Sequence, residues 1–516
     1  MKRIISTLTL IIGLNVLNAQ TNPLKIVTKS DEKLDGGKVE QLSNGNFILT
    51  KYYYKKWQYF NGLDLSMYDK NLNFVKSSHF EPIKGISTEG SIKWIPLADK
   101  TLILFTDPQK NSNVKFHVAS FSESDLLISP TLNFLFESNG KTSQGDMTIP
   151  ISDDKSKFAI INEYRNKDMS YFDNHTLSIW VYDKDLNKIY GGDYQTGATK
   201  QQMWGPSNMY WDIEFEKAKL TNQGNLLSFI QVKNGDKYNT SHLELLLFSK
   251  NLNTPKKQPL QIPNYHINSA SFHEDTKGNM YIVGSYGDPS MNNKVIGSYY
   301  VKVDQNTGEL ASNIQLIPIP SNLPTERSEK LFYRSGTLYF ITHGVHFLNN
   351  GTMNIVTELY KKSPSTYNTQ ANELVNEQID TYGLEVFVIN VNPSTGMVNH
   401  YKEIKKLQKA FNMDGESMSI SLSQKGNVTN IFYIDNPSNF KLKSSEAPIQ
   451  YVNKNAGNII VVTVNEKGEI AKYNLGSTEN IASDLRIRKF NKGVYANIYS
   501  STEKNGKAQI VNIISD

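Results

Sequence analysis

Apolar and polar residues alternate along most of this chain, in short runs that begin after turn-forming residues. The segments Leu42–Thr50, "LSNGNFILT", and Asp275–Val283, "DTKGNMYIV", each place a glycine turn before such a run. Successive side chains of a strand point to opposite faces, and Asn-Gly and similar pairs accept the positive φ of tight hairpins. The pattern therefore predicts antiparallel strands joined by hairpins.

These hairpin turns recur near positions 45, 99, 156, 224, 278, 336, 426 and 492. A second kind of turn lies between them. It is written "MYDKNLNFV" at Met67–Val75, "VYDKDLNKI" at Val181–Ile189 and "FSKNLNTPK" at Phe248–Lys256. Asp69 can accept hydrogen bonds from the backbone just beyond it, and Asn71 tolerates a left-handed conformation. Each turn joins two strands, so one turn of each kind describes a four-stranded antiparallel meander in each repeat.

A four-stranded sheet repeated at this spacing is typical of a β-propeller. We predict an all-β chain with a single propeller of four-stranded antiparallel blades, eight in number, with seven as the alternative. The last unit, Leu485–Ser515, provides about three strands, so we expect the N-terminal strand in Pro23–Ser30 to complete it and close the ring. A string of β-sandwiches, or two smaller propellers, also remains open.

Two insertions are expected within the propeller. One lies at about 347–382, where helix formers allow a short helix over the rim. The other lies at about 436–457, which is polar, contains Pro437 and Pro448, and is interpreted as a mobile loop. Either segment could act as a lid or could be surface decoration.

The N-terminus predicts export. Lys2 and Arg3 precede an apolar run from Ile4 to Leu17, which is too short to span a bilayer and has the form of a secretory signal peptide. We expect cleavage after Ala19, which assigns 1–19 to the signal peptide and 20–516 to the propeller. The exported chain is then periplasmic or extracellular, with no membrane insertion after cleavage.

Composition excludes several classes of protein. The chain of 516 residues has no cysteine, so it forms no disulfide. Losing Lys2 and Arg3 with the signal peptide lowers the formal charge from +5 to +3, and the basic residues form no stripe, so no nucleic-acid partner is expected. Aromatic residues make up 11% of the chain, many of them in alternating runs.

The connections between second and third strands are predicted to be long, and to lie on one face together with the crossing at 196–210. These connections are rich in rings. Tyr and Trp offer large contact area with a polar group, which suits sugars and peptide side chains. The alternative is that the rings pack between blades. The candidate ligand-binding residues are Tyr53, Trp57, Tyr59, Tyr164, Arg165, Tyr171, Trp204, Tyr210 and Trp211.

Evidence for catalysis is weaker. Carboxylates on the same face include Asp107 and Asp288, and the candidate catalytic residues are Glu163, Asp212 and Asp173. A glycosidase needs two such groups about 5–10 Å apart, which a sequence cannot pair. His343 and His346 alternate as in a strand and should lie on opposite faces, so no metal site is predicted. No cofactor motif is present.

Turns of the DKNLN type, the "VLNAQ" end of the signal peptide and the abundance of Lys, Asn and Tyr resemble secreted β-propeller proteins of Bacteroidota-type bacteria. The resemblance covers the whole chain, but its motifs are structural and imply no catalytic residue. Our leading hypothesis is a secreted, monomeric, non-catalytic propeller that binds a glycan, a peptide or a cell-envelope protein. The alternative is a propeller hydrolase or lyase that acts on polysaccharide through the carboxylates.

Overall fold

The protein is almost entirely β-structure. The computed structural model describes residues 24–29, 38–55, 59–69, 73–81, 92–109, 113–138, 147–163, 174–199, 218–233, 241–288, 294–320, 337–365, 378–410, 420–442, 446–452, 457–477, 484–490, 493–500 and 507–515. These residues contain strands β1 to β36, one short 3-10 helix, η3 (Pro437–Lys441), and no α-helix. The predicted all-β class is confirmed.

The described strands form eight sheets, numbered here along the chain. Sheet 1 contains β2 (Lys38–Gln41), β3 (Phe47–Lys55), β4 (Tyr59–Tyr68) and β5 (Phe74–Phe80). Sheet 2 contains β6 (Ile92–Pro96), β7 (Thr101–Pro108), β8 (Val114–Ser122), β9 (Leu127–Ile128) and β10 (Asn133–Ser138). Sheet 3 contains β11 (Met147–Thr148), β12 (Lys157–Glu163), β13 (Asn174–Asp183) and β14 (Lys188–Thr199). Sheet 4 contains β15 (Ala218–Leu220), β16 (Leu226–Lys233), β17 (Ser241–Phe248) and β18 (Lys256–Leu260).

The second half of the chain continues the series. Sheet 5 contains β19 (His266–Ile267), β20 (Ser271–Glu274), β21 (Met280–Asp288), β22 (Lys294–Val303) and β23 (Gln315–Pro318). Sheet 6 contains β24 (Thr337–Phe347), β25 (Met353–Ser365), β26 (Gln378–Val391), β27 (Val398–Ile404), β28 (Gln408–Ala410) and β31 (Tyr451–Val452). Sheet 7 contains β29 (Ser421–Lys425), β30 (Val428–Asp435), β32 (Asn458–Val464) and β33 (Ile470–Ser477). Sheet 8 contains β34 (Asp484–Phe490), β35 (Gly493–Ser500), β36 (Lys507–Ser515) and β1 (Leu24–Lys29).

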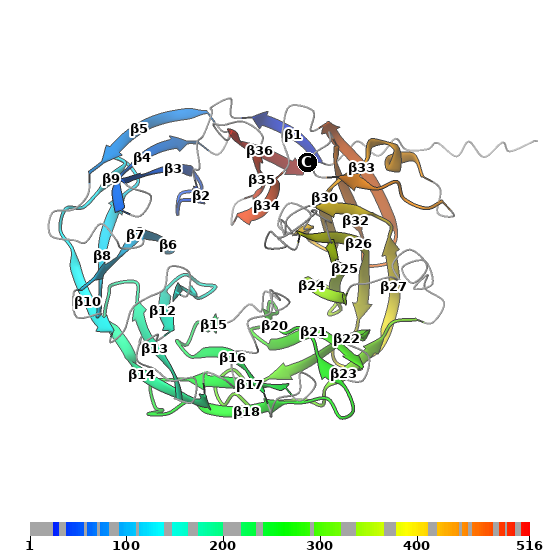
Figure 1. Cartoon of the computed structure of the whole chain (residues 1–516), viewed down its shortest axis with the longest axis horizontal. Helices are drawn as coiled ribbons and strands as arrows, with labels where there is room; N and C mark the ends of the chain where they lie inside the picture. The colour runs from blue at the N-terminus through cyan, green and yellow to red at the C-terminus, as the bar shows by residue number, and fades with distance from the viewer. Residues whose placement is uncertain are drawn as a thin grey trace, which may run out of the picture.

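The sheets stand around a common axis, and the strands nearest the centre include β2, β6, β15, β24 and β34 (Figure 1). Strand β1 from the start of the chain pairs antiparallel with β36 from its end, with Leu24 opposite Ser515. The chain is thus a β-propeller with several four-stranded antiparallel sheets. The exact count of eight blades and the closure of the ring stay predictions, with which these sheets and this pairing agree.

The Asp-containing turns are held by their own side chains. In the turn between β13 and β14, Asp183 accepts hydrogen bonds from the backbone N–H of Asp185 and of Asn187, both at 2.9 Å, and from the Asn187 side chain at 3.0 Å. Asp69 accepts from the Asn73 backbone in the same way at 2.8 Å, which confirms the predicted bonding. The left-handed residue of the β13–β14 turn is Leu186, with φ of 67°. Asn71, for which the sequence predicts this conformation, lies outside the described residues.

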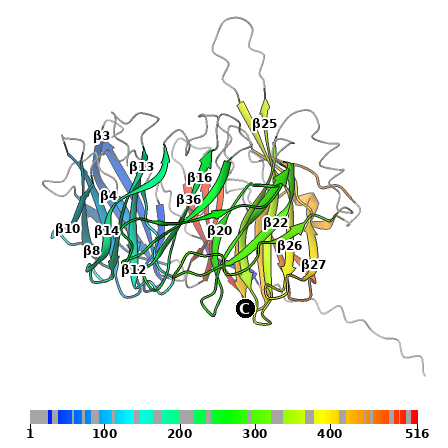
Figure 2. The ribbon, with the colours of Figure 1, turned by 90° about the horizontal axis from the view of Figure 1, so that it is seen from below.

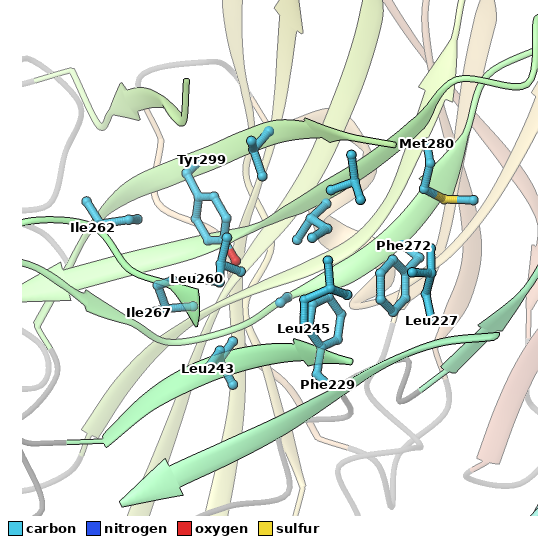
Figure 3. Packing of buried hydrophobic residues seen from close by; sticks show 14 of the residues in the cluster. Leu227, Phe229, Leu243, Leu245, Leu260, Ile262, Ile267, Phe272, Met280 and Tyr299 are labelled. Carbon is cyan, nitrogen blue, oxygen red and sulfur yellow. The ribbon is translucent and has the colours of Figure 1, made fainter. Parts of the chain in front are cut away.

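Apolar side chains fill the space between neighbouring sheets. Figure 3 shows the cluster between sheets 4 and 5, where Leu227, Phe229 and Leu245 meet Phe272 and Met280. The rings of Phe229 and Phe272 stack with centroids 4.2 Å apart and planes at 7°. One sheet alone would leave such residues in water, so each sheet is stabilised by its neighbours.

The sixth sheet differs from the prediction. The sequence predicts a first hairpin at Tyr333–Ile341 and an insertion at 347–382, but the first hairpin closes between β24 and β25, where Gly351 has φ of 81°. Most of the expected insertion is therefore strand, and β25 pairs with β26 as far as Ser365 opposite Gln378. The paired ends of β25 and β26 rise above the other strands of the ring (Figure 2). The segment 366–377 lies outside the described residues.

The expected loop at 436–457 carries structure where it is described. Asn436 caps the 3-10 helix η3, and its side chain accepts from the backbone of Ser438. The short strand β31 pairs in parallel with β28, with Tyr451 beside Gln408. This connection is therefore fixed to the neighbouring sheet at these points, because backbone groups of one blade bond to the other.

Candidate functional site

Two ends of the ring can be distinguished by their connections. The first turns of neighbouring sheets contact one another: Ala98 donates to the carbonyl of Lys155, Asp154 to the side chain of Asn222, and Asn349 to that of Asn427. We call this end the turn face. The connections from second to third strands leave from the opposite end, which we call the loop face.

The turn face is also joined by charges. Lys184 pairs with Asp99 at 2.6 Å and Lys100 with Asp185 at 3.0 Å, so two ion pairs join sheets 2 and 3. Surface pairs of this kind each contribute at most about 1 kcal/mol. Together with the backbone hydrogen bonds of the turns, these ion pairs fix the blades relative to one another. The longer connections leave from the opposite end, the loop face.

The aromatic segment of sheet 1 is mostly strand. β3 and β4 pair almost to the end of their hairpin, with Tyr53 opposite Gly62, Tyr54 opposite Phe60 and Lys55 opposite Tyr59. The sequence predicts a long connection at 53–62, whereas only 56–58 lies outside the described residues. A paired backbone thus brings this run of aromatic residues to the loop face.

The side chains of all the predicted site residues lie outside the described part of the chain. The backbones of Tyr53, Tyr59 and Glu163 belong to β3, β4 and β12, but their side chains are outside the described part. The remaining candidates, backbone included, are outside the described residues: Trp57, Tyr164, Arg165, Tyr171, Asp173, Trp204, Tyr210, Trp211 and Asp212. Their roles in binding or catalysis therefore stay predictions.

Asp107 on the second sheet is described. It is buried, and its carboxylate accepts a hydrogen bond of 2.7 Å from the Gln109 side chain. This contact organises the end of β7 at the loop face. Asp107 therefore stabilises the connection that follows β7, and we assign it no contact with a ligand.

A buried charged cluster in sheet 6 was not predicted from the sequence. Glu358 on β25 is 1% exposed, and its two oxygens pair with Lys406 and with His343, the latter at 2.6 Å. Lys406 is fully buried and also donates to Gln408, while Gln408 donates to the carbonyl of Ile434 on sheet 7. The cluster therefore connects two neighbouring blades through polar groups.

The electrostatics of this cluster favour charge on the glutamate. Burial alone would raise the pKa of Glu358, but the ammonium of Lys406 and the hydrogen bond from His343 outweigh it and hold that pKa below its ordinary value. The sequence contained one sign of this arrangement: Glu358 interrupts an apolar alternating run, on the same strand face as Val356.

His343 and His346 were predicted to lie apart. His343 bonds to Glu358, whereas His346 is buried and its Nδ1 lies 3.1 Å from the Thr429 hydroxyl of sheet 7. The expected strand is present, but it has an irregular register between Thr342 and Gly344. Among the described residues no group of three metal-ligating side chains occurs.

A second charged cluster joins three blades near the turn face. Lys219 of sheet 4 pairs with Asp153 of sheet 3 at 2.6 Å and lies 3.8 Å from Glu274 of sheet 5. Burial first, and then the neighbouring Asp153 carboxyl, raise the pKa of Glu274 to about 6. This carboxyl therefore changes charge close to neutral pH.

Asp435 at the end of β30 organises the 436–457 connection. Its carboxylate is fully buried and accepts from the side chain of Asn439 at 2.7 Å, with Lys472 at 3.7 Å. Burial is the main cause that raises the pKa of Asp435, and the hydrogen bond from Asn439 and the charge of Lys472 only partly oppose it. The contacts hold η3 against sheet 7.

Comparisons with known proteins bear on the fold alone. No protein-family model matches the chain, and no curated protein matches it in sequence. In fold the chain is similar to the WD40 domain of SCAP from fission yeast, at 9% identity and a TM-score of 0.38, over 96% of this chain and 98% of that one. It is also similar to the polysaccharide lyase Uly1, at 10% identity and a TM-score of 0.37, over 94% and 90% of the two chains.

A third similar structure is the β-propeller domain of the Trilobed protease from Pyrococcus furiosus. It is 9% identical, with a TM-score of 0.33 over 85% of this chain and 95% of that domain. These three structures are a WD40 domain, a polysaccharide lyase and a domain of a protease. No helix in the described part of the chain has the length and apolar character to cross a membrane.

Proposed function

We propose that the chain is an exported, non-catalytic β-propeller that binds a ligand on its loop face, with a glycan as the first candidate. One observation carries the proposal: the paired backbones of β3 and β4 extend an aromatic run, with Tyr54 opposite Phe60 and Lys55 opposite Tyr59, to the end of the ring where the longer connections leave. Aromatic residues on a rigid scaffold stack on sugar rings and lose little conformational entropy on binding.

The rest of the scaffold supports this assignment. The turn face is occupied by contacts between blades, such as the ion pair of Lys184 with Asp99. Longer connections leave from the other end, where β12 ends at Glu163, β16 at Lys233 and β25 at Ser365. A site that needs adaptable contacts on a fixed frame is best built there.

Binding is tested with a glycan array, insoluble polysaccharides and envelope fractions. The variants are Trp57→Ala and Trp211→Ala. A ring at the centre of a binding site contributes about 2 kcal/mol or more, so each should weaken binding at least about 30-fold. Phe134→Ala is the matched control, since Phe134 is 56% exposed on the outer strand β10 and should leave binding unchanged.

Three other outcomes would each lead to a different conclusion about the loop face. Retention by a peptide or by an envelope protein, lost in the same variants, would keep the loop face and change the ligand. Turnover of a polysaccharide that disappears in Glu163→Gln or Asp212→Asn, with Asp173→Asn for comparison, would establish the hydrolase or lyase. Equal binding by all variants and wild type would remove the loop-face site.

Export is part of the proposal. The first 23 residues lie outside the described part of the chain, so the signal peptide rests on the sequence pattern. Fractionation should recover the protein in the periplasm or outside the cell, with Gln20 as its first residue. A chain that keeps Met1 and stays in the cytoplasm would contradict export. The resemblance to secreted Bacteroidota-type propellers is consistent with this expectation.

A further inference from the structure

His343 lies on β24, the innermost strand of sheet 6 (Figure 1). The pairing of β24 with β25 passes from Thr342 opposite Thr357 to Gly344 opposite Val356, which leaves His343 with no residue across from it. Such a bulge locally increases the twist and turns the extra side chain to a new direction. The strand therefore gives His343 a direction that regular pairing would not.

The buried Glu358 fixes one side of the imidazole. Its carboxylate is kept ionised by Lys406, and an ionised carboxylate only accepts hydrogen bonds. The bond of 2.6 Å to Nε2 of His343 is therefore donated by the ring. In the neutral imidazole the proton is then on Nε2, and Nδ1 carries a lone pair.

The other ring nitrogen, Nδ1, takes no part in this contact. Among the described residues, Nδ1 of His343 has no hydrogen-bond partner, and the side chain is 14% exposed. His346, three residues along the same strand, differs because its Nδ1 lies 3.1 Å from Thr429 and the residue is 7% exposed. The His343 ring is thus bonded through one nitrogen and partly exposed, while His346 is buried against sheet 7.

The chain leaves space for this arrangement at Gly383. A Cβ there would lie 2.6 Å from Oε1 of Glu358 and 2.8 Å from Nζ of Lys406. Glycine at this position lets the charged pair approach the backbone of β26. Glu358 and Lys406 are thus held in place, and Glu358 can bond the His343 imidazole without rearrangement.

We propose that His343 is a second functional site, at which Nδ1 accepts a hydrogen bond from a hydroxyl group of a polar ligand such as a sugar. His343 contacts the ligand directly, and Glu358 is a positioning residue. The charged groups that face the ring from packed elements are Glu358 of β25 and Lys406 of the β27–β28 connection. This site does not depend on the loop face.

The tautomer is tested first, in the wild-type chain labelled with ¹⁵N-histidine. Long-range ¹H–¹⁵N spectra of the neutral ring should show the proton of His343 on Nε2. The Glu358→Gln variant should lose this preference. Removing one partner of a buried pair can prevent folding, and in that case the wild-type spectrum decides. A proton on Nδ1 of the wild-type ring would overturn the proposal.

Access is tested with diethyl pyrocarbonate. The Nδ1 lone pair attacks one carbonyl carbon of the reagent, and the anhydride C–O bond breaks. The acylated ring releases its Nε2 proton, and the departing ethyl carbonate takes up a proton and decomposes to carbon dioxide and ethanol. The reagent should acylate His343 in the wild-type chain and in His346→Gln. The His343→Gln variant should lack this modification. Methyl α-D-glucopyranoside should slow the reaction and shift the Nδ1 resonance, whereas its fully methylated analogue should do neither. An unreactive ring, or one that responds equally to both sugars, refutes the site.

Discussion

Gly383 offers a sharp test of the buried charged cluster. In Gly383→Ala, the added methyl would lie 2.6 Å from Glu358 Oε1, 2.8 Å from Lys406 Nζ and 3.2 Å from Gln408 Oε1. Contacts below about 3 Å require a shift of the neighbours, yet all three residues are buried and bonded on their other sides. The variant must therefore loosen the Glu358–Lys406 pair or displace β26.

The magnitude follows from two opposing effects. Overpacking a buried site costs about 1–3 kcal/mol, and weakening a buried ion pair adds to that cost. Because φ of Gly383 is outside the left-handed region, alanine is allowed by the backbone, and the smaller entropy of the unfolded chain returns about 0.4–1 kcal/mol. We expect a net loss of about 2 kcal/mol in the free energy of unfolding.

The assay is urea unfolding followed by tryptophan fluorescence. The matched control is Gly192→Ala on β14, where an added Cβ would meet no atom within 4 Å. This control should be unchanged or more stable by up to about 1 kcal/mol. If Gly383→Ala is as stable as Gly192→Ala, the space around Glu358 is not tightly filled, and the support proposed for the imidazole fails.

Three further predictions concern other parts of the scaffold. Phe229→Ala should lower the free energy of unfolding by about 3–5 kcal/mol in urea unfolding, because it removes the ring stacked on Phe272 between two blades, and a loss below 1 kcal/mol would refute this packing. Asp183→Ala should cost about 1–2 kcal/mol in the same assay, since it leaves three donors of its turn unbonded, and an unchanged midpoint would contradict that role. Burial and the nearby Asp153 raise the pKa of Glu274 to about 6, so protonation favours the folded chain: this stabilisation is complete below the ordinary glutamate pKa and is lost as pH rises through 6. Glu274→Gln should remove that part of the pH dependence of thermal unfolding, and an identical pH profile in both proteins would count against it.

Local signals in the sequence were reliable where a turn is decided by its own residues. Asp69 was predicted to accept hydrogen bonds from the backbone just beyond it, and it does so from Asn73 without help from the rest of the fold. The left-handed residue was less predictable, because Leu186 occupies that conformation in the second copy of the turn. There the bonds to Asp183 set the backbone, and the strain of a leucine is outweighed.

The position of the first hairpin in sheet 6 could not be decided locally. Ser335-Gly336 and Asn350-Gly351 are both turn signals between apolar runs. Pairing of β24 with β25 selects the second one, because it places Val356 against sheet 7 and lengthens β25 and β26. Register is chosen by which faces become buried, and that depends on residues far along the chain.

The sequence by itself determined that this chain is built from antiparallel four-stranded sheets, since alternation and turn chemistry act within a few residues. Only the tertiary structure decided which turns face each other at one end of the ring. It also decided that Glu358, Lys406 and His343 meet between two blades. Residues from separate strands come together there, and a charge can remain buried only because its partners arrive from other parts of the chain.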